Sequence, residues 1–233
     1  MAAEESDMDS KRRLLPLLLD LEGKLIVIFG GGLVGERKAR LFSDYGKVMV
    51  VSQDFTPGLM DMKSDLKLVN SSLTHGFEKY MEGAFIVVPA TGVPELNRAI
   101  ELEARARGLL VNKVDGIGDV VVPSLIRKDP ITIAISTESP GLTKYLRLRL
   151  EKDLTENFQQ MALLLAQIRQ DLKKTVPIQR DRARIIWKIL EDEEVWRLLD
   201  VSYEKAYMRA RSHVCHDERD SLDACDPPQG LHR

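Results

Sequence analysis

The chain has 233 residues, 44% of them hydrophobic and 30% charged, with a formal net charge of −2. This composition predicts a soluble globular protein, and the nearly balanced charge gives no field that would attract nucleic acid or an anionic membrane surface. The only cysteines, Cys215 and Cys225, are too few for a disulfide framework, and no run reaches the roughly 20 apolar residues of a membrane helix. We therefore expect a cytoplasmic protein.

The first predicted elements are two strands, at residues 14–19 and 25–29, and the second strand runs into a glycine-rich turn. The spacing Gly30-x-Gly32-x-x-Gly35 is typical of dinucleotide binding: one glycine makes the tight turn, one leaves room for the pyrophosphate, and one lets helix and strand lie close together. Backbone N–H groups at the start of the following helix would then face the phosphates. The alternative is a glycine-rich turn without a ligand.

Strands and helices alternate from this turn onward. The strands are rich in Val and Ile without polar alternation, which predicts a parallel sheet that is buried on both faces. The predicted fold class is therefore α/β, with a Rossmann-type domain over residues 13–112. Helices are expected near 33–45, 77–81 and 94–107, and strands near 47–52, 66–69, 84–89 and 109–114.

The end of the second of these strands bears on the choice of cofactor. Dinucleotide-binding folds usually carry an acidic residue here that binds the adenosine ribose, and this chain has Ser52 and Gln53 in that place. Asp54 is within reach of the 2′-hydroxyl, and no Arg is nearby to bind a 2′-phosphate. The sequence therefore favours NAD over NADP.

Two more strands, predicted at residues 120–123 and 131–135, come after the alternation has stopped. Two strands alone are not stable in water, so they either extend the parent sheet or pair with a second subunit. We favour a homodimer, with residues 113–139 as its dimerisation segment.

The hydrophobic period then changes to that of a helix. Ser139 is a predicted N-cap, followed by proline at the first helical position, and apolar residues between 146 and 172 form one continuous stripe. These patterns predict a helical domain over residues 140–210 and a disordered tail over residues 211–233.

Few residues beyond the glycines could carry chemistry. Asp115 follows a predicted buried strand, at the edge where open α/β sheets bind ligands, although it could instead cap the turn into Gly116. In the tail, the possible zinc ligands His213, Cys215, His216 and Cys225 match no standard zinc-site spacing. We therefore expect no bound metal.

Six segments, taken in order, point to a known family. They are LPLLLDLEGK just before the glycines, GGGLVGERKA at 30–39, AT at 90–91 with Asn97-Arg98 following, VNKVD at 111–115, VVPS at 121–124 and SPGLTKYLRLRLE at 139–151. Together they resemble the precorrin-2 dehydrogenase/sirohydrochlorin ferrochelatase family, the siroheme synthases, over about residues 14–175. The resemblance implies a homodimeric enzyme that passes a hydride from precorrin-2, a tetrapyrrole, to NAD and yields sirohydrochlorin. Some members also insert ferrous iron, which leaves iron as a possible second substrate and a ferrochelatase (lyase) activity open.

The resemblance also implies roles for single residues. Asp115 matches the family's essential carboxylate, and it is the predicted general base because the oxidation releases a proton as well as a hydride. Ser136 and Thr137 lie in the region of a family serine that is associated with the active site. The predicted cofactor-binding residues are Gly30, Gly32, Leu33, Val34, Gly35, Gln53, Asp54 and Thr91.

A tetrapyrrole of this pathway bears many carboxylates, and the predicted helix from Ser139 offers groups that would bind them. Its N-terminus is one, and Lys144 and Arg147, three residues apart on one face, are the others. We predict that Ser139, Lys144 and Arg147 bind the substrate. The alternative is a solvated basic face.

Two other classes of protein remain open. A regulatory domain of an ion-transport system would use the same fold to sense NAD without catalysis, and it would need no carboxylate like Asp115. A dehydrogenase for a small hydroxy or amino acid would normally supply a catalytic His, Lys or Arg from a sizeable substrate domain. Here His75 is the only histidine before the tail.

Overall fold

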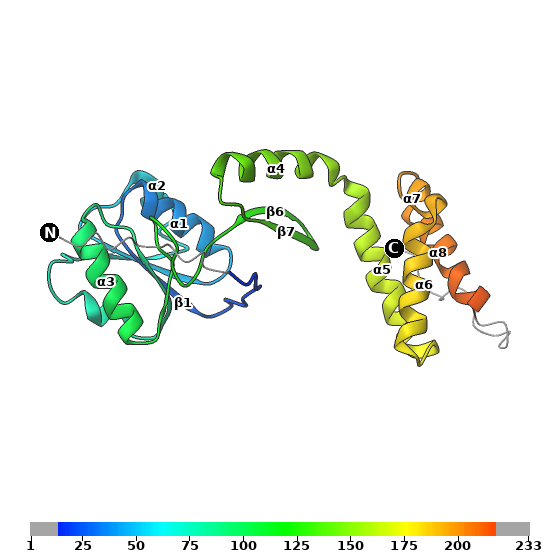
Figure 1. Ribbon diagram of the computed structural model, residues 1–233, viewed down its shortest axis with the longest axis horizontal. Helices are drawn as coiled ribbons and strands as arrows, with labels where there is room; N and C mark the ends of the chain where they lie inside the picture. The colour runs from blue at the N-terminus through cyan, green and yellow to red at the C-terminus, as the bar shows by residue number, and fades with distance from the viewer. Residues whose placement is uncertain (1–13, 218–233) are drawn as a thin grey trace, which may run out of the picture. The chain divides into compact units, whose positions relative to one another are not determined.

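The computed structural model describes residues 14–217, and the chain divides into two compact units between Val122 and Pro123. The first unit contains β1 (Leu25–Phe29), α1 (Leu33–Ser43), β2 (Lys47–Ser52), α2 (Pro57–Asp61), β3 (Lys67–Asn70), the 3-10 helix η1 (Phe77–Met81), β4 (Ala84–Pro89), α3 (Pro94–Ala106) and β5 (Leu110–Val111). The second unit contains β6 (Ser124–Lys128), β7 (Ile131–Ile135), α4 (Pro140–Asp153), α5 (Glu156–Thr175), α6 (Gln179–Glu191), α7 (Glu193–Leu199) and α8 (Tyr203–Asp217) (Figure 1).

The first unit is built around a parallel sheet with the strand order β3-β2-β1-β4-β5. Alternate side chains of β1 enter two cores, because successive residues of a strand point to opposite faces. Ile26 and Ile28 pack with α1 and α2, whereas Val27 and Phe29 pack with α3 and η1. The predicted α/β, Rossmann-type fold is confirmed. The strand order reverses between β1 and β4, which is where such sheets bind ligands.

The predicted strand at residues 14–19 is wrong, because residues 14–21 have no regular structure. Leu15, Leu17 and Leu18 are exposed, and the edges of the parallel sheet are β3 and β5. An apolar run becomes a strand only where a neighbouring strand receives its backbone hydrogen bonds. This segment has no such neighbour among the described residues.

The predicted strand at residues 120–123 is also wrong, since β6 begins at Ser124. The backbone N–H groups of Asp119 and Val120 both donate to the Val111 carbonyl, at 2.9 and 3.1 Å, which ties this stretch back to β5. The hairpin of β6 and β7 is a separate antiparallel pair and does not extend the parallel sheet. Ile126 and Ile135 of the hairpin are buried with Leu154, the residue that follows α4, and Leu146 of α4 packs against this cluster.

The helical region differs from the prediction in two places. Ser139 caps α4 as expected, because its side chain accepts a hydrogen bond from the Leu142 N–H at 3.4 Å. The apolar stripe, however, is broken at Leu154–Thr155, between α4 and α5. Helices α5 to α8 enclose the core of the second unit, whereas α4 has no buried residue. None of the helices in the described range is long and apolar enough to cross a bilayer.

Helix α8 extends to Asp217, so residues 211–217 are helical where the sequence predicted a disordered tail. The remaining residues of the predicted tail, 218–233, lie outside the described part of the chain. The predicted domain limits otherwise remain expectations.

Candidate active site

The turn after β1 is so crowded that three of its positions require glycine. Gly30 has φ 120°, and a Cβ there would collide with the Ala90 carbonyl at the end of β4. A Cβ on Gly31 would strike the Asp54 carbonyl, and one on Gly35 would strike the Gly30 carbonyl. Gly32 is different, since a Cβ there would meet nothing within 4 Å. The space beside Gly32 is therefore open to a ligand.

The turn is held to the neighbouring loop by hydrogen bonds. The Thr56 N–H donates to the Gly31 carbonyl at 3.0 Å, and the Thr56 hydroxyl donates to Glu36 Oε2 at 2.6 Å. Arg40 forms an ion pair with the same carboxylate at 2.9 Å. The hydrogen bond from Thr56, and then those from Arg40, lower the pKa of Glu36. The start of α1 is thus fixed before any ligand binds.

A cleft of about 640 Å³, which we call the glycine cleft, lies above this turn. Of the predicted cofactor-binding residues, Gly30, Gly32, Gln53, Asp54 and Thr91 line it. Leu33, Val34 and Gly35 form the first turn of α1 and do not line the cleft. The backbone N–H groups at a helix start lack intrahelical partners and attract anions. The glycine backbone and the start of α1 therefore fit a dinucleotide pyrophosphate, and exposed Asp54 fits the ribose.

Asn97 organises the loop that follows β4. Its side-chain oxygen accepts hydrogen bonds from the Thr91 N–H at 2.9 Å and from the Thr91 hydroxyl at 2.7 Å. Its amide donates to the Thr91 carbonyl at 3.0 Å. The signal in the sequence was an amide one helical turn into α3, a few residues after a Thr in the loop that follows β4.

A second cleft, of about 650 Å³, contains Asp115, and we call it the Asp115 cleft. The two clefts share Thr91 and Gly92 in their linings, so they adjoin at the end of β4. Asp115 is exposed in its loop. No hydrogen bond or ion pair joins its side chain to another residue within 14–217, so the carboxylate is exposed to a ligand in this cleft.

The loop that carries Asp115 is tied at its base by residues that the sequence did not single out. Asn112 is 2% exposed, and its amide donates to the Val120 carbonyl at 2.8 Å. Asp119 accepts a hydrogen bond from the Val111 N–H at 3.2 Å. A Cβ on Gly118 would collide with the Val111 carbonyl. These contacts close the loop, so the position of Asp115 is set by the structure around it.

The predicted substrate residues in the second unit surround the start of α4. The Thr137 hydroxyl donates to the Ser139 carbonyl at 2.7 Å and lies 2.7 Å from the Thr143 hydroxyl, while Ser136 is exposed. Arg147 forms an ion pair with Glu151 at 2.8 Å. Lys144 is exposed and has no ion pair among residues 14–217, which makes it the freer cation.

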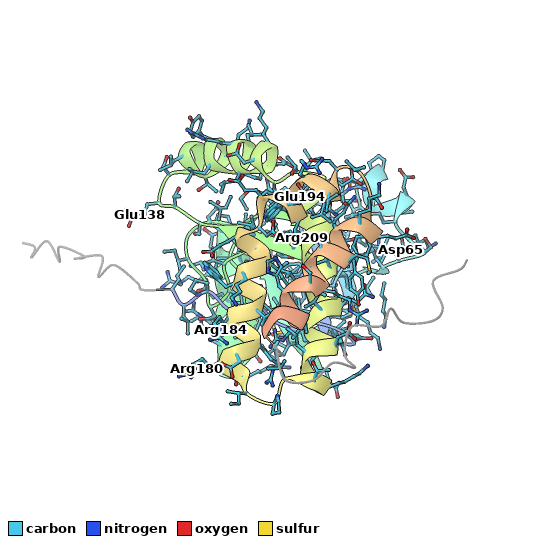
Figure 2. The ribbon with its side chains drawn as sticks, turned by 90° about the vertical axis from the view of Figure 1, so that its right-hand side faces the viewer. Asp65, Glu138, Arg180, Arg184, Glu194 and Arg209 are labelled. Atoms are coloured by element: carbon cyan, nitrogen blue, oxygen red, sulfur yellow. The ribbon has the colours of Figure 1, made fainter. Side chains whose placement is uncertain are left out.

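The part of the tail that can be described is bound within the second unit. His213 Nε2 and Arg209 Nε each lie 2.7 Å from Asp192, which also caps α7 by accepting from the Glu194 N–H at 3.0 Å. Figure 2 labels Glu194 and Arg209, which come from α7 and α8. Burial raises the pKa of Asp192, but the hydrogen bonds from His213, Arg209 and the Glu194 N–H outweigh it and lower that pKa. Within residues 14–217, no group of three or more His, Cys, Asp or Glu side chains could hold a metal ion; Cys225 lies outside that range.

The fold and the two clefts define a dinucleotide-binding protein of the Rossmann class with a second, adjoining cleft. A family model described as "Putative NAD(P)-binding" matches residues 17–124. A precorrin-2 dehydrogenase from Methanosarcina barkeri is 42% identical over 211 residues, which cover 87% of this chain and 94% of that protein. The chain belongs to the precorrin-2 dehydrogenase family.

Two further comparisons agree with this family. A siroheme synthase from Ectopseudomonas mendocina is 30% identical over 182 residues, or 76% of this chain, and the match spans 38% of that longer protein. The solved structure of SirC, a precorrin-2 dehydrogenase, matches with a TM-score of 0.68 at 21% identity, covering 85% of this chain and all of that one. At this identity the SirC structure supports the fold.

Proposed function

We propose that this protein oxidises precorrin-2 to sirohydrochlorin with NAD as the hydride acceptor. The observation that carries the proposal is that the two clefts share Thr91 and Gly92, so that the carboxylate of Asp115 adjoins the nucleotide-binding surface. The relative of 42% identity, which this chain matches over 94% of its length, supports the same activity. The NAD(P)-binding domain supplies the site for the cofactor.

Different residues bind the cofactor and accept the proton in the proposed reaction. When bound, NAD accepts the hydride that leaves the macrocycle. The backbone of Gly30 to Gly32 and the start of α1 would hold the pyrophosphate, while Thr91, fixed by Asn97, borders both clefts. The oxidation also removes a proton, and Asp115 is the carboxylate that accepts it as a general base. A fixed loop keeps that carboxylate beside the substrate, which contributes to the rate through positioning.

Asp54 at the ribose position supports NAD rather than NADP, since the lining of the glycine cleft contains no Arg or Lys that would bind a 2′-phosphate. Ferrous iron is a proposed second substrate, for which the names of the siroheme synthase relatives give limited support. If iron is inserted, the pyrrole protons must leave, and Asp115 is again the proposed acceptor. The two rival classes, an NAD sensor and a dehydrogenase of small acids, are represented by none of the relatives described above.

We propose that Ser136, Thr137, Ser139, Lys144 and Arg147 bind substrate carboxylates, with Lys144 the strongest candidate because Arg147 is already paired with Glu151. A cytoplasmic location is also proposed, since two cysteines suit a reducing compartment.

A homodimer is proposed from the surface of α4. This helix has no buried residue, and two of its apolar side chains, Tyr145 and Leu148, are 58% and 43% exposed. A helix with exposed apolar side chains next to a two-stranded sheet needs a partner to cover it. Leu148→Glu should halve the mass measured by light scattering. The matched control Leu163→Glu alters an exposed leucine of α5 and should not change that mass; a monomeric wild type would contradict the proposal.

The test of the enzymatic proposal is to incubate the purified protein with precorrin-2 and NAD and to follow NADH and sirohydrochlorin by absorbance. Asp115→Asn should lower kcat by about 10²- to 10⁴-fold and leave the Kd for NAD unchanged. The matched control Asp65→Asn removes an exposed carboxylate outside both clefts, labelled in Figure 2, and should retain full activity. Full activity of Asp115→Asn would remove Asp115 from the mechanism. Addition of ferrous or cobaltous ion to the product then tests metal insertion.

A further inference from the structure

The Asp115 cleft has a charged wall made by α3 and the end of β5. Its charged lining residues are the cations Arg98, Arg105 and Lys113 and the carboxylates Glu101 and Asp115. Arg98, Glu101 and Arg105 are spaced three and four residues apart, so they share one face of α3. What each cation can do for a ligand depends on which of them are already paired.

Two of the three cations are paired with the same carboxylate. Arg105 Nη2 lies 3.1 Å from Glu101 Oε1, and Lys113 Nζ lies 3.1 Å from Glu101 Oε2. Both oxygens of Glu101 are therefore occupied, and its side chain is only 13% exposed. Arg105 also approaches Asp119 at 3.4 Å, which further commits its charge. Arg105 and Lys113 therefore act as structural partners of this wall.

Arg98 is left without a partner. It stands three residues before Glu101, a spacing at which the two side chains could pair, but the oxygens of Glu101 are taken by Arg105 and Lys113. No hydrogen bond or ion pair joins the Arg98 side chain to any other residue in the range 14–217, and Arg98 is exposed in the lining of the cleft. It also follows Asn97 directly, the residue that fixes Thr91 at the border of the two clefts.

We propose that Arg98 binds a peripheral carboxylate of the macrocycle in the Asp115 cleft and thereby determines specificity for an acidic substrate. This inference rests on the proposed function. A guanidinium binds a carboxylate through two parallel hydrogen bonds, which fixes both the position and the orientation of the ligand. Arg98 and Asp115 line the same cleft and form no ion pair with each other, so Arg98 can attract an acidic substrate while the Asp115 carboxylate stays unbound.

The experiment compares Arg98→Gln, Arg98→Lys and the control Lys63→Gln, which removes the same charge from an exposed turn outside both clefts. Arg98→Gln should raise the KM for precorrin-2 about 10- to 100-fold, as expected for a lost charge-assisted hydrogen bond, with kcat and the Kd for NAD within about twofold of wild type. Arg98→Lys should recover part of the KM, because it restores the charge without the bidentate geometry. Lys63→Gln should match the wild type.

Direct binding of sirohydrochlorin, measured by fluorescence quenching without NAD, distinguishes an error in the role of Arg98 from an error in the proposed function. Weaker binding to Arg98→Gln than to Lys63→Gln supports the role of Arg98. If the wild type oxidises precorrin-2 but Arg98→Gln has an unchanged KM, or loses NAD affinity to the same extent, this inference is overturned and the proposed function stands. If the wild type neither binds sirohydrochlorin nor oxidises precorrin-2, the proposed function itself is wrong.

Discussion

The two adjoining clefts of the first unit are built in different ways. The glycine cleft is shaped by backbone, since Gly30, Gly31 and Gly35 are positions where any Cβ would collide with a carbonyl group. The Asp115 cleft is shaped by side chains, through the ion pairs of Glu101 and the loop contacts of Asn112. Backbone geometry suits a cofactor that many proteins share, whereas side chains can be exchanged to suit one substrate. Substitutions in the glycine cleft should therefore affect stability or NAD affinity, whereas substitutions in the Asp115 cleft should affect turnover of the substrate.

The largest effect is expected where the backbone itself has no freedom. Gly30→Ala adds a Cβ at φ 120° that would collide with the Ala90 carbonyl, and it should lower the free energy of unfolding by about 3 kcal/mol or more. Urea unfolding followed by circular dichroism measures this loss. A Gly30→Ala protein as stable as the wild type would show that the turn after β1 can rearrange to accept a side chain.

Gly32→Ala is the matched variant in the same turn. Because a Cβ at Gly32 meets nothing within 4 Å, the free energy of unfolding should change by no more than about 1 kcal/mol. The methyl group would instead occupy the space where we propose that the pyrophosphate binds, so the Kd for NAD should rise at least about tenfold. Calorimetric titration with NAD checks this result. Unchanged affinity would place the pyrophosphate elsewhere.

In the Asp115 cleft, loss of a contact that supports the loop should lower kcat and leave the affinity for NAD unchanged. Asn112→Ala removes the hydrogen bond to the Val120 carbonyl and should cost about 1 to 2 kcal/mol of unfolding free energy. It should also lower kcat by about tenfold, because the loop no longer holds Asp115 in place. The Kd for NAD should remain that of the wild type. An equal loss of NAD affinity would show that the two clefts are not supported independently.

The same contrast explains how much could be predicted from the sequence. The glycine spacing and the Val-rich strands predicted the parallel sheet, because both report local backbone requirements. The positions of Asn97 and Asn112 could not be predicted, since their hydrogen bonds join segments six and eight residues away in geometries that appear only after folding. The apolar runs at 14–19 and 120–123 were wrongly predicted to be strands, because a strand depends on a neighbour that composition cannot reveal.

A change outside both clefts gives the baseline for these comparisons and the smallest expected effect. The Tyr207 hydroxyl donates to Asp171 at 2.8 Å, and burial together with this carboxylate raises the pKa of Tyr207 from 10.0 to about 12. The folded state therefore holds the phenolic proton more tightly than the unfolded state does. The resulting stability is complete below pH 10 and is lost as the pH rises through about 12.

Tyr207→Phe should lose about 1 kcal/mol at neutral pH and should show a smaller fall in stability between pH 10 and about 12 than the wild type. Urea midpoints measured across this pH range check both expectations. Tyr203→Phe is the control, because burial alone raises the pKa of Tyr203 and its hydroxyl donates to the neutral amide oxygen of Gln167 at 3.2 Å. If Tyr203→Phe reduced the fall in stability between pH 10 and about 12 as much as Tyr207→Phe does, the carboxylate of Asp171 would not be the cause of that fall. Since both tyrosines lie in the second unit, neither variant should change the Kd for NAD, so a change in that Kd would link the helical core to the glycine cleft.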